Sequence, residues 1–327
     1  MADELVSARV VKLDRGYPLV ELDNGVELRC KHATALVKGK ETRAVIGDRV
    51  MVNVPPDADK AQIVQVLPRT SSLVRRDPSE RTLPQTLAAN FDTVIVAHPL
   101  AELNVRRLER ELVLAHETGA AVVVALTKAD LASAERAHEA FAHVRAMCAQ
   151  GVAVLQVSEA DPESIEELRA LVPKGSVAVL IGRSGVGKSS LVNMLAGAQV
   201  QETTPVRASD GKGRHTTVSR SMIALPGGGM IVDMPGVRGL GLWESERGLQ
   251  AAFPDIVQLS EHCRFRDCAH ENEPGCAVQE ALRSGSLAPE RLESYQHLVR
   301  ENEEVREAEE QAQRQRERRG HPRRRKG

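Results

Sequence analysis

A glycine-rich stretch at residues 182–190 constrains the fold of this chain more than any other feature. It reads GRSGVGKSS and has the G-x-x-x-x-G-K-S spacing of a phosphate-binding loop. An apolar run, SVAVLI, precedes it, and a helical pattern, SLVNMLAG, follows it. The backbone N–H groups of such a loop must converge at the start of a helix that leaves a buried strand. The stretch therefore predicts an α/β fold built on a parallel sheet.

The rest of the middle segment supports this prediction. Val-rich and Ile-rich runs alternate with amphipathic helical patterns, which is typical of a mostly parallel sheet covered on both faces. The expected strands are FDTVIVAHPL, AAVVVAL, VAVLQVS, SVAVLI, SRSMIAL and MIV, and the expected helices are VRRLERELVLAHETG, ERAHEAFAHVRAMCAQG and ESIEELRALV. A turn-rich, charged stretch at 68–85 precedes them and is interpreted as a linker.

The residue types of the loop suit a polyphosphate. Glycines let the backbone curl toward the phosphates, Lys188 can neutralise the β and γ oxygens, and the Ser189 hydroxyl can ligate Mg²⁺. A chance match is the alternative, although loop, strand and helix would all have to agree. The expected nucleotide contacts are Gly182, Arg183, Ser184, Gly185, Val186, Gly187, Lys188, Ser189 and Ser190.

A second motif, TKAD at residues 127–130, ends a strand pattern upstream of the phosphate loop. Asp130 can accept hydrogen bonds from N1 and the exocyclic amine of guanine, a pattern that adenine cannot offer. The Lys128 stem can lie along the base, and Ser158 follows the next strand where a backbone N–H can meet the base carbonyl. We therefore expect Thr127, Lys128, Asp130 and Ser158 to bind guanine. A charge and a cap at a helix start are the structural alternative.

Two further motifs follow the phosphate loop. In GKGRHTT, at residues 211–217, Thr216 can bring a hydroxyl to Mg²⁺ and a backbone N–H to the γ-phosphate. In D-x-x-G, Asp233 can hold Mg²⁺ through water, and Gly236 can turn toward the γ-phosphate. An ordinary flexible loop is the alternative for the first motif. After a phosphate loop, the two stretches together indicate nucleotide-dependent switches.

The order of these motifs is reversed, because the guanine loop precedes the phosphate loop. A permuted sheet still brings every loop to the carboxyl ends of its strands, where ligands bind in such folds. The sequence therefore predicts a circularly permuted GTP-binding domain.

The N-terminal segment predicts a different unit. Residues 5–67 alternate apolar and polar positions between turn signals such as Asp23-Asn24-Gly25, which indicates about five strands and an OB-type barrel. Tyr17 is the only aromatic residue there, and basic residues gather between 29 and 49. This pattern favours contact with the backbone of folded RNA over base stacking. A barrel that only covers its neighbour is the alternative.

The C-terminal segment carries a Cys/His cluster. Cys263, Cys268, His270 and Cys276 offer three thiolates and one imidazole within fourteen residues, which predicts one closed, structural zinc site. Chance clustering is the alternative. The chain ends in RQRERRGHPRRRKG, whose seven arginines suit an RNA phosphate backbone or, alternatively, a solvated tail without a specific partner.

Composition places the chain in a reducing compartment. No apolar run reaches the roughly 18–20 residues of a membrane span, and the start MADELVSARV lacks the pattern of a signal peptide. Five cysteines are an odd number for a disulfide framework. We expect a cytoplasmic protein, without a membrane partner, with a barrel domain at 1–70, a permuted GTPase domain at 71–244 and a helical zinc-binding domain with a basic tail at 245–327.

The reversed motif order, the preceding barrel and the Cys-x4-Cys-x-His-x5-Cys cluster together resemble the bacterial small-ribosomal-subunit-dependent family of circularly permuted GTPases. The resemblance spans nearly the whole chain. It implies GTP hydrolysis stimulated by the small (30S) subunit, contact with its 16S rRNA near the decoding region, and a late role in its maturation. We expect a monomer with one Zn²⁺, and with Mg²⁺ bound alongside GTP.

The resemblance also implies a catalytic residue. In that family the histidine of G-x-H-T-T is proposed to replace the glutamine that positions water, and this residue is His215 here. Val237, after Gly236, cannot orient water. One departure is Thr127, where the family commonly has Asn, and we expect its shorter hydroxyl to reach the base or the neighbouring loop less well. Guanine preference then depends on Asp130.

Two other functions fit parts of the sequence. An RNA-binding assembly module could hold the nucleotide as a static structural ligand, in which case GTP and GDP would give equal subunit affinity. A P-loop ATPase could carry TKAD by chance, in which case Asp130→Asn would leave base discrimination unchanged.

Overall fold

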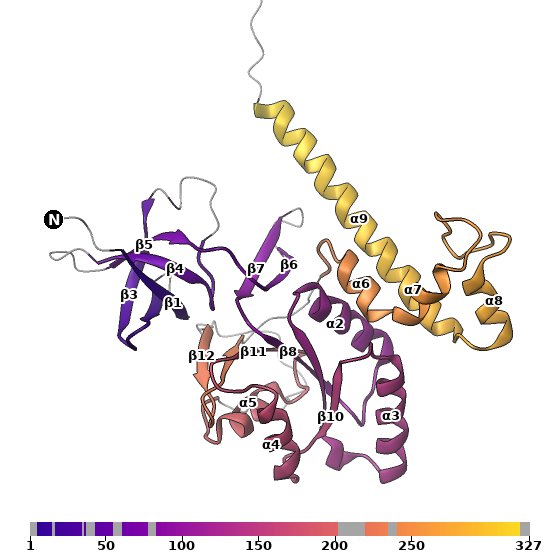
Figure 1. The fold of residues 1–327 in the computed structure, drawn as a ribbon, viewed down its shortest axis with the longest axis horizontal. Helices are drawn as coiled ribbons and strands as arrows, with labels where there is room; N and C mark the ends of the chain where they lie inside the picture. The colour runs from indigo at the N-terminus through magenta and orange to yellow at the C-terminus, as the bar shows by residue number, and fades with distance from the viewer. Residues whose placement is uncertain are drawn as a thin grey trace, which may run out of the picture.

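The computed structural model describes residues 5–14, 17–34, 36, 43–54, 61–77, 83–201, 220–234 and 241–320, with side chains as far as 315. Three parts follow one another across the molecule (Figure 1): a β-barrel, a central sheet covered by helices, and a helical part that ends in a long helix.

The first five strands close a barrel. They are β1 (Leu5–Asp14), β2 (Tyr17–Leu22), β3 (Glu27–His32), β4 (Arg49–Asn53) and β5 (Ala61–Val66). Their order is β1-β2-β3-β5-β4, and β4 pairs back with β1. Alternate residues, including Val10, Val20, Val52 and Ile63, are fully buried inside. The predicted five-stranded OB-type barrel is confirmed.

The central sheet carries the nucleotide motifs. Its strands are β8 (Thr93–Pro99), β9 (Ala121–Thr127), β10 (Ala153–Val157), β11 (Val177–Ile181), β12 (Arg220–Ala224) and β13 (Met230–Asp233). They lie in the order β10-β9-β8-β11-β13-β12, and every pairing within this set is parallel except β12 with β13. The predicted mostly parallel sheet is confirmed.

Helices cover both faces of this sheet. They are α2 (Val105–Glu117), α3 (Ala134–Met147), α4 (Pro162–Ala170) and α5 (Lys188–Ala196), and a 3₁₀ turn spans Ala129–Leu131. Successive residues of β8 point to opposite faces: Val94 and Val96 join the core under α2, whereas Ile95 and Ala97 join the core under α4 and α5. This double burial explains the continuous apolar runs of the sequence.

The expected linker at 68–85 is wrong for much of its length. Strands β6 (Ser72–Arg76) and β7 (Pro84–Ala89) form an antiparallel hairpin there. Leu73 and Leu87 are fully buried in the central core, so the hairpin belongs to the body of the protein. Pro84 is the first residue of its strand, where the missing N–H is tolerated.

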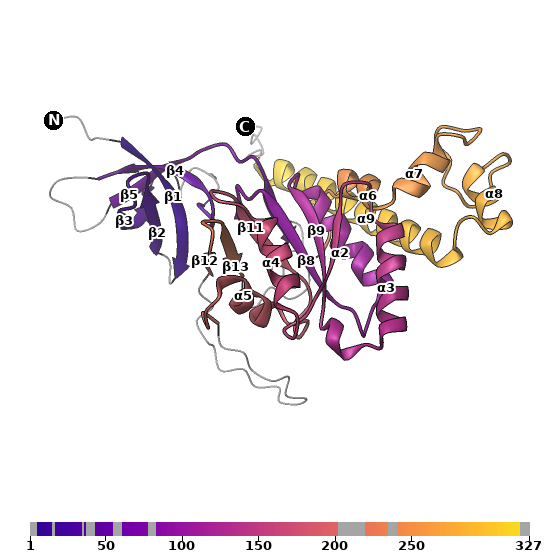
Figure 2. The same cartoon turned by 60° about the horizontal axis from the view of Figure 1, so that its bottom comes forward.

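The barrel is joined to the central sheet. β1 pairs with β12 in antiparallel register, Lys12 opposite Ser221 and Leu13 opposite Arg220, which produces one sheet of eleven strands among the described residues. Asp48, completely buried, accepts two hydrogen bonds of 2.8 Å from Arg69, which immediately follows the barrel. Arg69 also donates to the Thr86 hydroxyl of β7 at 3.3 Å, so it links the barrel to the hairpin of the central part. The barrel lies beside the β12 edge of the central sheet (Figure 2).

The C-terminal part consists of α6 (Glu246–Ala252), α7 (Pro254–Ser260), α8 (Ala277–Ser284) and α9 (Pro289–Gly320). Arg291 of α9 ties this part to the nucleotide domain: it pairs with Glu109 of α2 at 2.7 Å and with Asp255 at 2.9 Å, and its guanidinium lies 4.2 Å from the ring centre of Phe253. The far end of α9 projects from the body (Figure 1). No helix in the described part of the chain has the length and apolarity to cross a membrane.

Candidate functional site

The phosphate loop lies between β11 and α5, as the sequence predicts. Gly182, Gly185 and Gly187 have φ angles of 143°, 85° and 96°, which L-residues rarely adopt. A Cβ on Gly182 would lie 2.4 Å from the carbonyl oxygen of Ala97 in β8. Backbone conformation therefore favours glycine at all three positions, and close packing on the neighbouring strand also requires it at Gly182.

Lys188 is folded back over this loop. Its Nζ donates to the carbonyl oxygens of Gly182 at 2.6 Å and Arg183 at 2.7 Å. Burial lowers the pKa of Lys188, and the carboxylates of Glu111 and Asp233 oppose that shift. The ammonium is thus held where phosphate oxygens can replace the two carbonyls.

The TKAD motif contacts the phosphate loop directly. The Thr127 hydroxyl lies 2.7 Å from the carbonyl oxygen of Val186 and 3.3 Å from that of His98. Lys128, with a left-handed φ of 57°, reaches the carbonyl oxygen of Gly185 at 3.1 Å. The buried Thr127 hydroxyl thus reaches the neighbouring loop and joins the two loops. That it reaches less well than an asparagine would stays a prediction.

The structure also brings together two of the four residues expected to bind guanine. Asp130 lies in the 3₁₀ turn after β9, and the Ser158 hydroxyl, after β10, donates to its Oδ1 at 2.8 Å. The Ser158 N–H donates to the Ser164 hydroxyl at 3.3 Å. The Asp130 carboxylate is therefore oriented by a neighbouring loop end.

Asp233 is the last residue of β13. Its Oδ2 accepts a hydrogen bond of 2.6 Å from the Gln201 side chain. Burial raises the pKa of Asp233 to about 6, and the Lys188 ammonium opposes the shift. The Lys188 ammonium therefore favours the ionised form of this carboxylate, against the effect of burial.

The remaining expected contacts divide into two groups. Ser189 and Ser190 lie in the first turn of α5, and Arg183 and Ser184 are exposed on the loop. His215, Thr216 and Gly236 lie outside the described residues.

A buried pair beneath the site was missed in the sequence. His98, at the end of β8, places Nδ1 3.0 Å from Glu111 Oε2, while its Nε2 accepts the N–H of Asn104 at 3.2 Å. His98 is 1% exposed. Gln201, whose side chain donates to Asp233, was also missed in the sequence. A histidine within the apolar run FDTVIVAHPL was the available signal for the pair.

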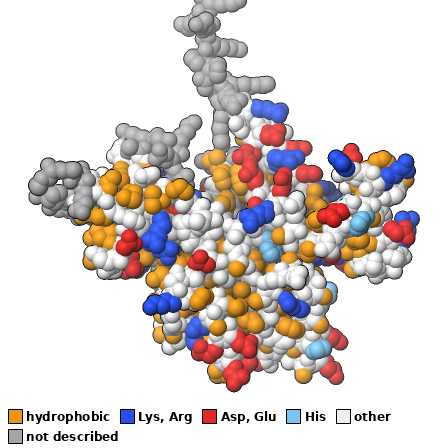
Figure 3. Space-filling model, viewed as in Figure 1, with side chains coloured by type: hydrophobic (Ala, Val, Ile, Leu, Met, Phe, Trp, Pro, Cys, Tyr) orange, Lys and Arg blue, Asp and Glu red, His pale blue; other side chains and the backbone are white. Residues whose placement is uncertain are grey.

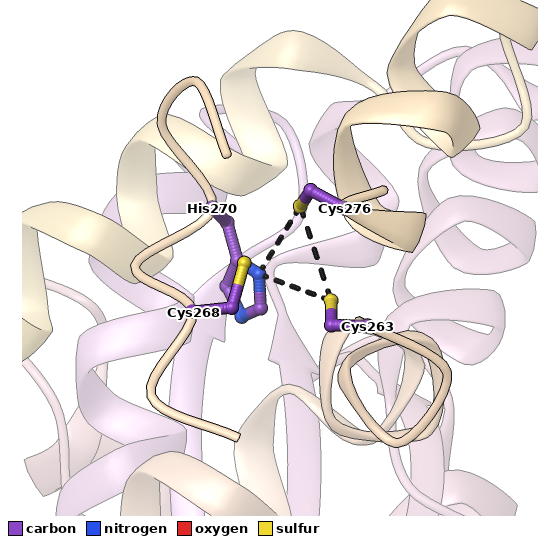
Figure 4. A group of neighbouring side chains, drawn as sticks. All are labelled: Cys263, Cys268, His270 and Cys276. Carbon is purple, nitrogen blue, oxygen red and sulfur yellow. Dashed lines mark hydrogen bonds between the residues drawn. The ribbon is translucent and has the colours of Figure 1, made fainter. Parts of the chain in front are cut away.

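The Cys/His cluster forms one compact group (Figure 4). His270 Nδ1 lies 3.6 Å from Cys263 Sγ and 3.5 Å from Cys276 Sγ, and these two sulfurs are 3.9 Å apart. With Cys268 Sγ included, all four ligand atoms lie within 4.8 Å of one another. Tetrahedral Zn²⁺ with usual bond lengths separates two sulfurs by about 3.8 Å, and sulfur from nitrogen by about 3.6 Å. The donor set and its spacing fit zinc.

Hydrogen bonds outside the cluster hold the ligand loop. The His270 carbonyl oxygen accepts from Gln279 at 2.6 Å and from Gln296 of α9 at 3.2 Å. The Glu273 carboxylate accepts the backbone N–H groups of Ala269 and Glu271 at 2.8 and 2.9 Å. The loop is therefore anchored to α8 and α9, as expected for a structural centre.

Comparison with known proteins agrees with this geometry. A family model described as RsgA GTPase matches residues 66–243, and one described as 50S ribosome-binding GTPase matches 177–316. A protein of Streptomyces coelicolor named small ribosomal subunit biogenesis GTPase RsgA is 44% identical over 305 residues, 93% of this chain and 82% of that protein. One of the same name from Syntrophotalea carbinolica is 40% identical, over 89% of this chain and 82% of that protein.

Solved structures share the fold. YjeQ from Thermotoga maritima superposes with a TM-score of 0.67 at 25% identity, covering 89% of this chain and 96% of its own. YloQ, described as a circularly permuted GTPase, gives a TM-score of 0.66 over 92% of this chain and 96% of its own; at 23% identity it is evidence of fold alone. Because the RsgA model covers more than half of the chain and the relatives match most of it, this chain belongs to the RsgA GTPase family and is a GTP hydrolase.

Proposed function

We propose that this GTPase acts in late maturation of the small (30S) ribosomal subunit, that the subunit stimulates its GTP hydrolysis, and that it binds 16S rRNA near the decoding region. The observation that carries the proposal is the joining of the TKAD and phosphate loops at one sheet edge, in a chain whose relatives are named small ribosomal subunit biogenesis GTPases.

Within the site, we assign the residues as follows. Lys188 binds the β- and γ-phosphates, Asp130 reads guanine with its carboxylate fixed by Ser158, and Thr127 and Lys128 brace the phosphate loop. The full set of nucleotide contacts is Thr127, Lys128, Asp130, Ser158, Gly182 to Ser190, Thr216, Asp233 and Gly236.

The hydroxyls of Ser189 and Thr216 would hold Mg²⁺ directly, and Asp233 would hold it through water. When bound, the ion neutralises charge that develops on the phosphates. His215 positions the attacking water, a role that the resemblance to the family implies for it; Val237, after Gly236, has no group that can orient water. Hydrolysis releases the switch stretches and thereby the subunit.

The zinc centre has a structural role in this proposal. Four protein ligands leave no open position for catalysis. We assign one Zn²⁺ to Cys263, Cys268, His270 and Cys276, where it fixes the connection between α7 and α8.

Charge on the surface supports contact with rRNA. On the barrel, Arg29 and Arg49 form ion pairs with Asp14 and Asp23. Both arginine side chains are 43% exposed, so a phosphate can compete for them. On the zinc loop, Phe265 is 41% exposed. The Arg264 guanidinium lies 5.4 Å from the Phe265 ring centre, an arrangement that suits an unpaired base. The basic tail adds a third contact.

The organisation of the chain is part of the proposal. We assign the barrel to residues 1–70, the permuted GTPase domain to 71–244 and the zinc-binding helical domain to 245–327. The protein acts as a cytoplasmic monomer.

Steady-state hydrolysis of GTP and ATP, with and without purified small subunits, tests the proposal. We expect GTP turnover that rises strongly only with subunits, and no comparable turnover of ATP. Lys188→Ala should abolish turnover, and His215→Ala should remove the stimulated part. Equal subunit affinity with GTP and GDP would instead favour an RNA-binding module with a static nucleotide, and equal use of ATP would contradict guanine recognition.

A further inference from the structure

A pocket between α2 and α9 lies outside the nucleotide and zinc sites. Its volume is about 300 Å³, and its lining includes Arg106, Arg107 and Arg110 of α2, together with Glu293 and His297 of α9. Three arginines from two turns of one helix thus line a single hollow. Glu293 is the only carboxylate among its described lining residues.

The placement of these arginines opposes the electrostatics of their own helix. α2 begins at Val105 and has no acidic residue in its first turn, which instead contains Arg106 and Arg107. The N-terminal end of a helix carries partial positive charge, so cations there are unfavourable, and Arg106 and Arg110 are like charges four residues apart. An anion in the pocket would relieve both repulsions.

The carboxylates near the pocket neutralise these arginines unequally. Arg110 is firmly held, because Glu301 accepts from both of its terminal nitrogens and the pair is largely buried. Arg106 pairs with Glu293 at 2.6 Å, but both side chains are more than 60% exposed, so the pair is weak.

Arg107 is held less firmly than either neighbour. Its Nε lies 3.8 Å from Glu111 Oε1, which is beyond hydrogen-bond distance. Arg106 and Arg107 can therefore turn toward a stronger anion while Arg110 keeps the two helices together.

We propose that this pocket binds a phosphate group through Arg106 and Arg107, assisted by His297. A phosphate offers acceptor oxygens to both planar guanidinium forks at once, whereas the Glu293 carboxylate pairs with Arg106. Two sources share this chemistry: the backbone of RNA and a small phosphorylated molecule. Acidic and basic side chains gather along the described part of α9 (Figure 3), so a ligand here has to compete with carboxylates.

The first test uses inorganic pyrophosphate as the probe and titration calorimetry as the readout. The full-length, zinc-loaded chain is first saturated with GDP and Mg²⁺, so that the phosphate loop is filled. We expect one binding event per chain. Arg106→Gln together with Arg107→Gln should weaken it by about tenfold or more, because two charge-assisted contacts are lost.

Two further variants make the test specific. Glu293→Gln removes the competing carboxylate and should tighten pyrophosphate binding, an outcome that misfolding cannot imitate. Arg136→Gln, on an exposed position of α3, is the matched control and should leave binding unchanged. The proposal is overturned if pyrophosphate does not bind, or binds the double arginine variant equally well, and the RNA experiment also shows no effect of that variant.

An RNA experiment distinguishes an RNA backbone from a small phosphorylated molecule as the source of the phosphate. This experiment rests on the proposed function, whereas the pyrophosphate titration does not. The affinity for small subunits is measured against salt concentration for the original chain and the double arginine variant. If RNA supplies the phosphate, the slope of log affinity against log salt should fall by about 2 in the variant, roughly 1 per lost contact. An unchanged slope with intact pyrophosphate binding assigns the pocket to a small molecule. An unchanged slope without pyrophosphate binding excludes the site, and subunit-stimulated hydrolysis would still test the proposed function separately.

Discussion

Replacing Thr127 by Val tests whether one hydroxyl joins the guanine loop to the phosphate loop. The substitution keeps the shape of the side chain, which is 5% exposed, but removes its proton donor. The Val186 carbonyl oxygen, 2.7 Å away, then loses its partner in a buried setting. An unsatisfied buried acceptor costs about 1–3 kcal/mol. The His98 carbonyl oxygen is farther away, at 3.3 Å, and adds less.

The cost should appear as weaker nucleotide binding. If about 1–2 kcal/mol of it disfavours the loop conformation that binds phosphates, affinity for GDP falls by about 5- to 30-fold. The loss should be the same for inosine diphosphate, because the hydroxyl braces the loop without reading the base. Asp130→Asn should instead change the ratio between the two nucleotides.

Stopped-flow release of fluorescent GDP, with competition by inosine diphosphate, measures both quantities. Thr127→Ser keeps the hydroxyl and is the matched control. Thr127→Asn offers an amide donor at the same place and should restore most of the affinity. A Val variant with unchanged GDP release, or one that alters the preference between bases, would refute the bracing role.

Three other predictions concern stability. Burial, reinforced by Arg247, lowers the pKa of His116 from 6.5 to about 4, so the unfolded chain binds a proton at a higher pH than the folded chain does. The free energy of unfolding should therefore fall as pH drops from about 6.5 to about 4. Urea unfolding measured across this pH range should show a flatter dependence for His116→Leu. Arg291→Met leaves the carboxylate of its α2 partner buried without a cation and should cost about 3–5 kcal/mol in the same assay, which Glu109→Leu in addition should largely recover. Cys276→Ser should reduce zinc content by atomic absorption and lower the melting temperature, whereas Cys148→Ser, outside the cluster, should leave zinc content unchanged.

Much of the candidate site could be predicted because its signals are local. The phosphate loop needs glycines at fixed spacing, and the structure places them at positive φ. TKAD follows a strand, so its position at the carboxyl edge follows from the parallel sheet alone. The four side chains of the Cys/His cluster lie within fourteen residues, and their approach requires only a short loop.

Contacts between distant segments could not be predicted. The hairpin at 72–89 was hidden by its prolines and charges, although Leu73 and Leu87 bury themselves in a core formed by later residues. The Thr127 hydroxyl finds its acceptor 59 residues away, and Arg291 finds Glu109 across 182 residues. The sequence around Thr127 and around Arg291 contains no pattern that indicates these partners.

By itself, the sequence determined the permuted motif order, the barrel strands and the Cys/His cluster, because hydrophobic alternation and motif spacing act over a few residues. Only the tertiary structure decided that β1 continues the central sheet through β12, that Thr127 braces the phosphate loop, and that α2 and α9 enclose an arginine pocket. Those features depend on which surfaces meet once the chain is packed, and packing is a property of the whole fold.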